Sequence, residues 1–131
     1  MAFKTADFDS SILPYKIIQD TDLGTAGGTT ANARVDMTNG ESGLLYSIQI
    51  DNRSGNAIYF KMTFTETSVT VGTTEAQLMI KVPATTVEDV TMPEGIDFTT
   101  LSMWAVTGNA VSSTTPAASN SAPVLVTLVT S

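Results

Sequence analysis

Carboxylates are the only side chains here whose type suggests catalysis near neutral pH, because the 131 residues include no histidine and no cysteine. Without imidazole or thiol there is no ordinary proton relay, no activated serine and no zinc ligand of the usual kinds. Glu88 and Asp89 are adjacent, so on a strand they point to opposite faces and cannot serve one substrate as acid and base. We therefore expect a protein with no catalytic residue, no cofactor and no enzymatic activity.

Three short segments could still be taken for sites. Asp20 and Asp22 place two carboxylates in one segment, which leaves calcium binding open beside a solvated loop, although the other ligands of an EF-hand are missing. Residues 40–44 (GESGL) lack the closing glycine of a nucleophile elbow. Asn52, Arg53 and Ser54 form a glycosylation triplet, but we interpret it as a turn because residues 1–20 lack the pattern of a signal peptide. The sequence therefore predicts no metal site.

The charge balance bears on possible partners. Thirteen carboxylates against six lysines and arginines give a formal net charge of -7, so there is no basic patch for a phosphate backbone or anionic lipid. No apolar stretch approaches the roughly 18 residues of a membrane span. We expect no nucleic-acid and no membrane partner. The acidic surface either keeps an apolar β-protein soluble or docks on a basic partner.

Alternating apolar residues indicate strands with one buried face. The alternation is clearest in residues 44–51 and 57–65. The predicted buried faces consist of Leu44, Tyr46, Ile48 and Ile50 in the first run and of Ile58, Phe60, Met62 and Phe64 in the second. Five turn-forming residues, 52–56, separate the runs, so we predict an antiparallel hairpin between them. Lys61 then lies on the exposed face, where substitution should matter little.

Further strands are predicted at residues 76–82, 86–92, 100–107 and 123–130, with a turn at Pro93–Gly95. Residues 12–18 form an apolar strand interrupted by Pro14, which favours a sheet edge. Residues 34–38 suggest one more strand, and residues 20–32 and 111–122 suggest long surface loops. The predicted fold is an all-β antiparallel sandwich, immunoglobulin-like or jelly-roll-like, of about seven or eight strands. Residues 1–42 form an N-terminal arm with edge strands, and residues 43–131 form the core.

The apolar residues at the two ends of the chain suggest an interface. Val124, Val126 and Leu128 share one face of the last strand while Leu125 and Val129 share the other, so both faces need cover. That cover is either the protein's own N-terminal segment or a neighbouring subunit. The sole tryptophan is either core or lid, or an exposed aromatic at a protein interface or sugar-binding surface. The candidate interface residues are Ile12, Leu13, Tyr15, Ile17, Trp104, Leu125 and Val129.

From Gly43 to the last residue, the order of these motifs resembles a group of small bacteriophage and prophage virion proteins. The segments that carry the resemblance are residues 57–62 (AIYFKM), 70–74 (TVGTT), 80–84 (IKVPA), 92–98 (MPEGIDF), 103–107 (MWAVT), the Thr114-Thr115 loop and the final strand. Residues 85–86 (TT) stand where glycines are expected, and about forty N-terminal residues fall outside the pattern. The resemblance implies a β-sandwich building block of a phage particle, with no catalytic residues.

The expected function is a non-enzymatic structural component of a bacteriophage virion, most of all a capsid decoration or cement protein. A tail, neck or fibre component is the alternative within the particle. A carbohydrate-binding host-adsorption module using Trp104, Tyr46 or Tyr59 is the alternative from another class. The expected partners are further copies of the chain and other virion proteins, with the major capsid protein favoured. The expected location is the virion, after synthesis in the host cytoplasm.

Overall fold

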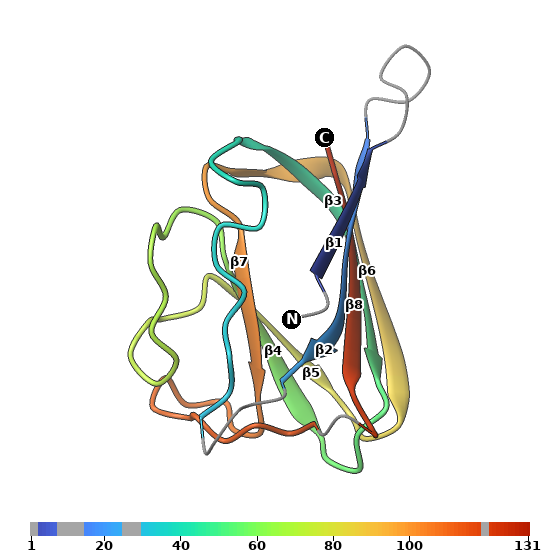
Figure 1. Ribbon diagram of the computed structural model, residues 1–131, viewed down its shortest axis with the longest axis vertical. Coiled ribbons are helices and arrows are strands. Elements are labelled where there is room, and N and C mark those ends of the chain that lie inside the picture. The colour runs from blue at the N-terminus through green and yellow to red at the C-terminus, as the bar shows by residue number, and fades with distance from the viewer. Residues whose placement is uncertain (1–2, 8–14, 25–29, 119–120) are drawn as a thin grey trace.

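A computed structural model describes residues 3–7, 15–24, 30–118 and 121–131. The regular elements of these residues are strands, which form two facing sheets (Figure 1). The eight strands described are β1 (Phe3–Asp7), β2 (Lys16–Leu23), β3 (Gly43–Asn52), β4 (Ile58–Thr63), β5 (Leu78–Val82), β6 (Thr86–Phe98), β7 (Ser102–Val106) and β8 (Val124–Thr130). A five-stranded sheet has the order β1-β2-β8-β3-β6 and a three-stranded sheet the order β5-β4-β7. All the pairings are antiparallel, which confirms the predicted β-sandwich.

The core lies between the sheets and follows the alternation of each strand. In β8 every second side chain is buried, beginning with Val124, while the residues between are half-buried. Strand β4 faces β8's sheet from the other layer and contributes Ile58, Phe60 and Met62, each 0% exposed. These side chains belong to one continuous apolar cluster. Among the described residues, no helix is long and apolar enough to cross a membrane.

The predicted hairpin between the two most regular strands is wrong. Strand β3 pairs with β6 and β8, whereas β4 pairs with β5 and β7 in the opposite sheet. The intervening turn is drawn inward by Asn52, whose fully buried amide group donates hydrogen bonds to the carbonyls of Val82, Pro83 and Asn56. Strands in facing sheets bury one face each, as strands of a hairpin do. Alternation alone could therefore not separate the two arrangements.

Strand β6 is longer than predicted because the expected turn at Pro93–Gly95 is a bulge inside it. Leu45 pairs with Ile96 and Ser47 with Thr91, so residues 92–95 lie opposite the single residue Tyr46. Against β8, Leu45 pairs with Thr130 and Ser47 with Val129, so Tyr46 is an extra residue in β3 and changes which side chains of this strand enter the core. Leu45 is buried together with Ile48 and Ile50, while Leu44 and Tyr46, which we predicted to be buried, are half-buried. The extra residue in β3 reverses the facing of the residues that precede it.

The N-terminal strands also differ from expectation. Strand β2 begins at Lys16 and lies between β1 and β8, so it has two neighbours, and β1 forms the sheet edge. Pro14, the basis of the edge prediction, lies outside the described residues. The predicted strand at residues 34–38 is reduced to a single bridge between Arg34 and Met103. The chain turns away there because Asp36 and Asn39 take positive φ angles of 51° and 54°, which extended strands do not allow.

Loops cover the outer face of the three-stranded sheet. The segments around residues 30–42, 64–77 and 107–118 gather on the side of β7 and β4 that faces away from the five-stranded sheet (Figure 1). Trp104 is 1% exposed and forms a second apolar cluster with Ala31 and Val106. Ala33, Val69, Val71 and Ala76 pack against this cluster. Strands β4 and β7 are thus largely buried on both faces, whereas β5 keeps exposed side chains and the five-stranded sheet has no described segment drawn over its outer face (Figure 1).

Candidate functional site

Asp20 and Asp22 hold an arginine. Arg34 Nε donates to Asp20 Oδ2 at 2.5 Å, and its Nη2 donates to Asp22 Oδ1 at 2.6 Å. The Arg34 side chain is 6% exposed and that of Asp20 0%, so the pair lies inside the fold. Asp20 is on β2, and Arg34 forms the bridge to β7. The ion pair therefore ties the N-terminal half of the five-stranded sheet to the loop over the other sheet.

Burial raises the pKa of Asp20 by penalising the charged carboxylate, while the Asp22 backbone N–H and Arg34 act in the opposite direction. The carboxylate oxygens face a guanidinium and an amide N–H rather than open solvent. This arrangement removes the basis of the calcium interpretation for Asp20 and Asp22. Among the described ranges, no three acidic side chains come together as a possible metal site.

Lys61 lies inside the protein, contrary to the sequence-based expectation of an exposed position. The residue is 3% exposed, and its Nζ donates to the carbonyl oxygen of Ala110 at 2.8 Å. Loss of solvation lowers the pKa of Lys61 below its ordinary value. Its position opposite Trp104 in the β4–β7 pairing places it under the loops that cover this sheet. Lys61 therefore holds the loop at residue 110 and is not available to a partner.

The glycosylation triplet and the adjacent carboxylates Glu88 and Asp89 also have defined positions in the structure. Asn52 has a fully buried side chain whose Oδ1 accepts hydrogen bonds from Ser54, so the triplet is a turn, as interpreted, and its amide is not free for a glycan. Glu88 and Asp89 are half-buried and exposed in turn along β6. Adjacent positions on a strand point to opposite faces, as expected. These two carboxylates do not form a catalytic pair.

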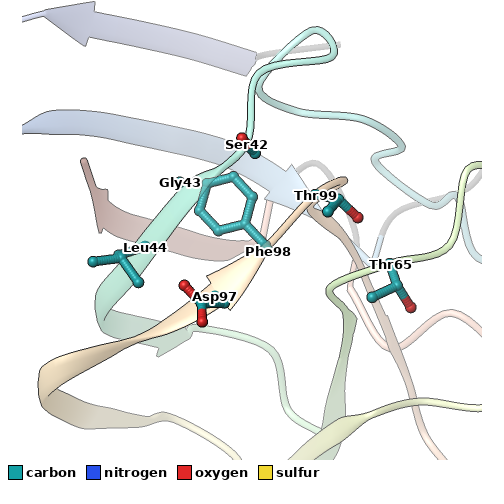
Figure 2. Close-up of a pocket in the computed structure, with 7 residues that line it drawn as sticks. All are labelled: Ser42, Gly43, Leu44, Thr65, Asp97, Phe98 and Thr99. Carbon is teal, nitrogen blue, oxygen red and sulfur yellow. The ribbon is translucent and has the colours of Figure 1, made fainter.

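A shallow hollow opens at one end of the sandwich, where β3 begins and β6 ends. It encloses about 410 Å³ and is lined by Ser42, Gly43, Leu44, Thr65, Asp97, Phe98 and Thr99 (Figure 2). The Phe98 ring lies against Gly43, where a Cβ would come within 3.1 Å of the ring. Asp97 is the only ionisable side chain in the lining. A single carboxylate beside hydroxyl groups provides no acid–base pair for chemistry.

The structure brings several predicted interface residues together on the outer face of the five-stranded sheet. Ile17 and Val129 are cross-strand partners, and both are half-buried. Leu125 points the same way from β8. At the end of the strip the rings of Tyr15 and Tyr46 meet edge to face, with their centroids 5.4 Å apart. We call Tyr15, Ile17, Tyr46, Leu125 and Val129 the apolar strip.

Trp104 and Tyr59 do not belong to the apolar strip. Trp104 is buried in the second apolar cluster. The interpretation of this residue as part of the core is therefore confirmed, and the alternative of an exposed aromatic at an interface or sugar-binding surface is wrong. Tyr59 belongs to the opposite sheet from Tyr46, and the Lys81 Nζ lies 5.9 Å from its ring centroid. The aromatic side chains of the carbohydrate-binding alternative thus share no surface. Ile12 and Leu13 lie outside the described residues.

Sequence reasoning missed the internal cations. Arg34 was assigned to a strand and Lys61 to a solvated face, yet both are nearly buried. A signal for Arg34 exists in retrospect, because the two carboxylates Asp20 and Asp22 occupy alternate strand positions. For Lys61 no local signal exists, since the loops that bury it are distant in sequence.

Comparison with known proteins gives one structural likeness. No protein-family model matches the sequence, and no curated protein matches it. In fold the chain is similar to the coat protein of Tobacco streak virus, with a TM-score of 0.45 and 10% sequence identity. The alignment covers 88% of this chain and 85% of that chain.

Proposed function

We propose that this chain is a non-enzymatic structural component of a bacteriophage virion, a capsid decoration protein that docks through the apolar strip. The observation that carries the proposal is the position of Ile17, Leu125 and Val129 on a sheet face that no described segment covers (Figure 1). Uncovered apolar side chains gathered on one face are a common mark of a protein–protein interface. The resemblance of residues 43–131 to phage virion proteins supports the same role.

The internal use of the charged groups also supports a role without catalysis. Arg34, Asp20 and Lys61, which are the buried charged side chains among the described residues, all make internal contacts. The single carboxylate in the hollow has no ionisable neighbour in the lining. The chain therefore contributes shape, surface and edge strands. Further copies of the chain and the major capsid protein are the proposed partners, and the virion is the proposed location.

The experiment is a double substitution, Leu125→Ser with Val129→Ser, introduced into the phage. We expect the variant to fold but to be lost from purified particles, because serine replaces two outward-facing apolar side chains of β8 and removes their contact with the partner. Occupancy on particles is measured by quantitative gel analysis and electron microscopy, and oligomeric mass by sedimentation. The matched control is Val111→Ser, which changes a residue that is 41% exposed in the loop between β7 and β8, away from the apolar strip.

The possible outcomes separate the alternatives. A folded double variant with wild-type occupancy and unchanged mass would show that the apolar strip is not the interface. Electron microscopy of the wild-type particle then separates positions: density on the tail, neck or fibre would replace the decoration assignment. Absence of the protein from purified particles would contradict the virion role itself.

A further inference from the structure

Strands β5 and β6 each form one edge of their sheet, opposite the edges formed by β7 and β1, and they lie on the same side of the sandwich. Each stands at the end of its sheet order and pairs with one neighbour only, β4 for β5 and β3 for β6. The short connection at residues 83–85 keeps the two edges adjacent where β5 ends and β6 begins. An edge strand presents a row of backbone donors and acceptors with no partner in its sheet.

The core reaches the surface between these two edges. Apolar residues of both strands pack against the main cluster yet stay partly exposed, and we call this region the β5–β6 seam: Leu78, Ile80, Val90, Met92 and Ile96. The bulge adds a hollow of about 430 Å³ at residues 92–96. Val87 is 49% exposed and Met79 47% exposed beside the seam. Covering such a surface removes apolar area from water and stabilises a complex.

The charge of β6 indicates which partner fits. The strand carries Glu88, Asp89, Glu94 and Asp97 and no lysine or arginine. The four ion pairs found among the described residues use Lys16, Arg34 and Arg53, and none of them reaches β6. A second copy would bring an equally acidic strand to this edge, and like charges on facing strands are destabilising. Charge complementarity therefore favours a basic partner.

We propose that β6 is the docking site for an extended, basic segment of a partner protein, which adds to the five-stranded sheet as a new strand. Residues 86–92 offer a regular run of alternating positions for this pairing. Side chains at alternate positions of the segment are apolar and cover Val90 and Met92, while those between are lysine or arginine and face Asp89. Backbone hydrogen bonds supply affinity, and the two faces supply specificity. This proposal depends on the unpaired edge of β6 and does not require that the protein belong to a virion.

The first test uses a probe peptide and the intact chain. The probe is a synthetic peptide of about seven residues in which valine and lysine alternate, a typical strand length. A matched peptide has glutamate in place of every lysine, and a second has the same composition with the valines and lysines in two blocks. Binding is measured by fluorescence anisotropy, and the docking position by amide hydrogen exchange. We expect only the alternating basic peptide to bind, with slower exchange at alternate amides of residues 86–92 and weaker binding at high salt.

Two variants test whether Asp89 is the carboxylate that attracts the basic peptide. Asp89→Lys should weaken binding of the basic peptide roughly tenfold, which corresponds to about 1.4 kcal/mol. Glu66→Lys makes the same charge change at an exposed loop residue and should leave binding within twofold. Urea denaturation shows whether each variant folds. If Asp89→Lys does not fold, the wild-type comparison of the three peptides still decides.

Several results would overturn the proposal. Equal weakening by Asp89→Lys and Glu66→Lys would mean non-specific attraction to an acidic protein. Protection of amides elsewhere, or equal binding of the glutamate peptide, would exclude an added basic strand at β6. Concentration-dependent protection of β6 without peptide would show that a second copy is the occupant. Loss of particle occupancy in the double variant at the apolar strip would leave this inference untouched, because the peptide assay needs no particle.

Discussion

Buried charges in this protein fasten loops and strands to one another. Arg34 links β2 to the segment that bridges β7, and Lys61 links β4 to the loop at Ala110. A buried charge without a partner carries a large desolvation penalty. Removing one member of either contact should therefore destabilise the folded protein strongly. Surface pairs such as Lys16 with Glu41 are different, because solvent screens them. Lys16 nonetheless lowers the pKa of the Glu41 carboxyl by donating a hydrogen bond to it.

Replacing Arg34 with alanine should lower the free energy of unfolding by about 3–5 kcal/mol, because the buried Asp20 carboxylate would lose its partner. Urea denaturation followed by circular dichroism measures the change. The control is Arg53→Ala, which removes the surface pair with Asp51, where the side chains are 59% and 28% exposed. That change should cost less than about 1 kcal/mol. Equal costs would contradict the burial of the Arg34 cluster.

The pKa of Lys61 predicts how stability depends on pH. Because burial lowers this pKa from its ordinary 10.5, the native state loses the proton at a lower pH than the unfolded chain does. Between the two values the unfolded chain binds more protons, so the stability contributed by Lys61 rises with pH. Wild type should therefore gain stability relative to Lys61→Met on approaching pH 10.5, and the difference should be constant below this window. A series of urea denaturations at increasing pH measures it, and a pH-independent difference would mean that Nζ is hydrated.

At the scale of elements, the irregular pairing of β3 decides which of its side chains are buried, and the bulge in β6 lies opposite the same residue, Tyr46. Gly95 makes the bulge possible, since it takes a φ of +78° and lies against Leu44. Glycine adopts this conformation at little steric cost, whereas other residues rarely do. Because Tyr46 is an extra residue of β3 against β8, Leu45, and not Leu44 or Tyr46, enters the core. The same distortion ends the regular run of edge positions on β6 at residue 92.

A pair of glycine substitutions separates strain from contact at the bulge. Gly95→Ala places a Cβ 2.9 Å from the Leu44 Cβ at a φ of +78°, so it combines a clash with backbone strain. Gly40→Ala has nearly the same φ, +83°, but no atom within 4 Å of the new Cβ. We expect a cost of about 1 kcal/mol for Gly40→Ala from strain alone and about 2–4 kcal/mol for Gly95→Ala. Thermal unfolding of both variants measures the difference, and similar costs would argue against close packing at the bulge.

At the scale of the whole molecule, the two most regular strands are central to different sheets. Strand β3 lies between β8 and β6, and β4 lies between β5 and β7. Both should therefore be among the slowest regions in amide exchange, because each is hydrogen-bonded on both sides. Their stability depends on the core between the sheets rather than on a shared turn. An isolated peptide of residues 44–65 should accordingly form no stable hairpin.

Truncation of the core tests this arrangement. Ile48→Ala on β3 and Phe60→Ala on β4 should each cost roughly 2–5 kcal/mol, since both side chains are fully buried in the same cluster. Ile48→Ala should raise exchange in β4 as well as in β3, because the two sheets share one core and lose it together. Hydrogen exchange measured by NMR reports each strand separately. Fast exchange throughout β3 and β4 in the wild-type protein would contradict the structure.

The sequence by itself determined the fold class, because alternation with period two and turn residues are local properties. It placed β5, β7 and β8 within two residues of their observed ends, and it separated Val124, Val126 and Leu128 from Leu125 and Val129 on opposite faces of β8. It also predicted an interface from apolar residues at the two ends of the chain together with Trp104; the structure brings Tyr15, Ile17, Leu125 and Val129 to one face, buries Trp104, and does not describe Ile12 and Leu13. These conclusions need only the geometry of a single strand.

Only the tertiary structure decided which strands pair and which charges are buried. The turn at Asn52 links two sheets because the Asn52 amide binds carbonyls at residues 82 and 83, a contact across the molecule that local rules do not contain. Trp104 and Lys61 are buried by loops far away in sequence. Arg34 was expected in a strand and lies in a buried ion cluster for the same reason. Burial and strand order depend on long-range packing, whereas the alternation of a strand depends on its own residues.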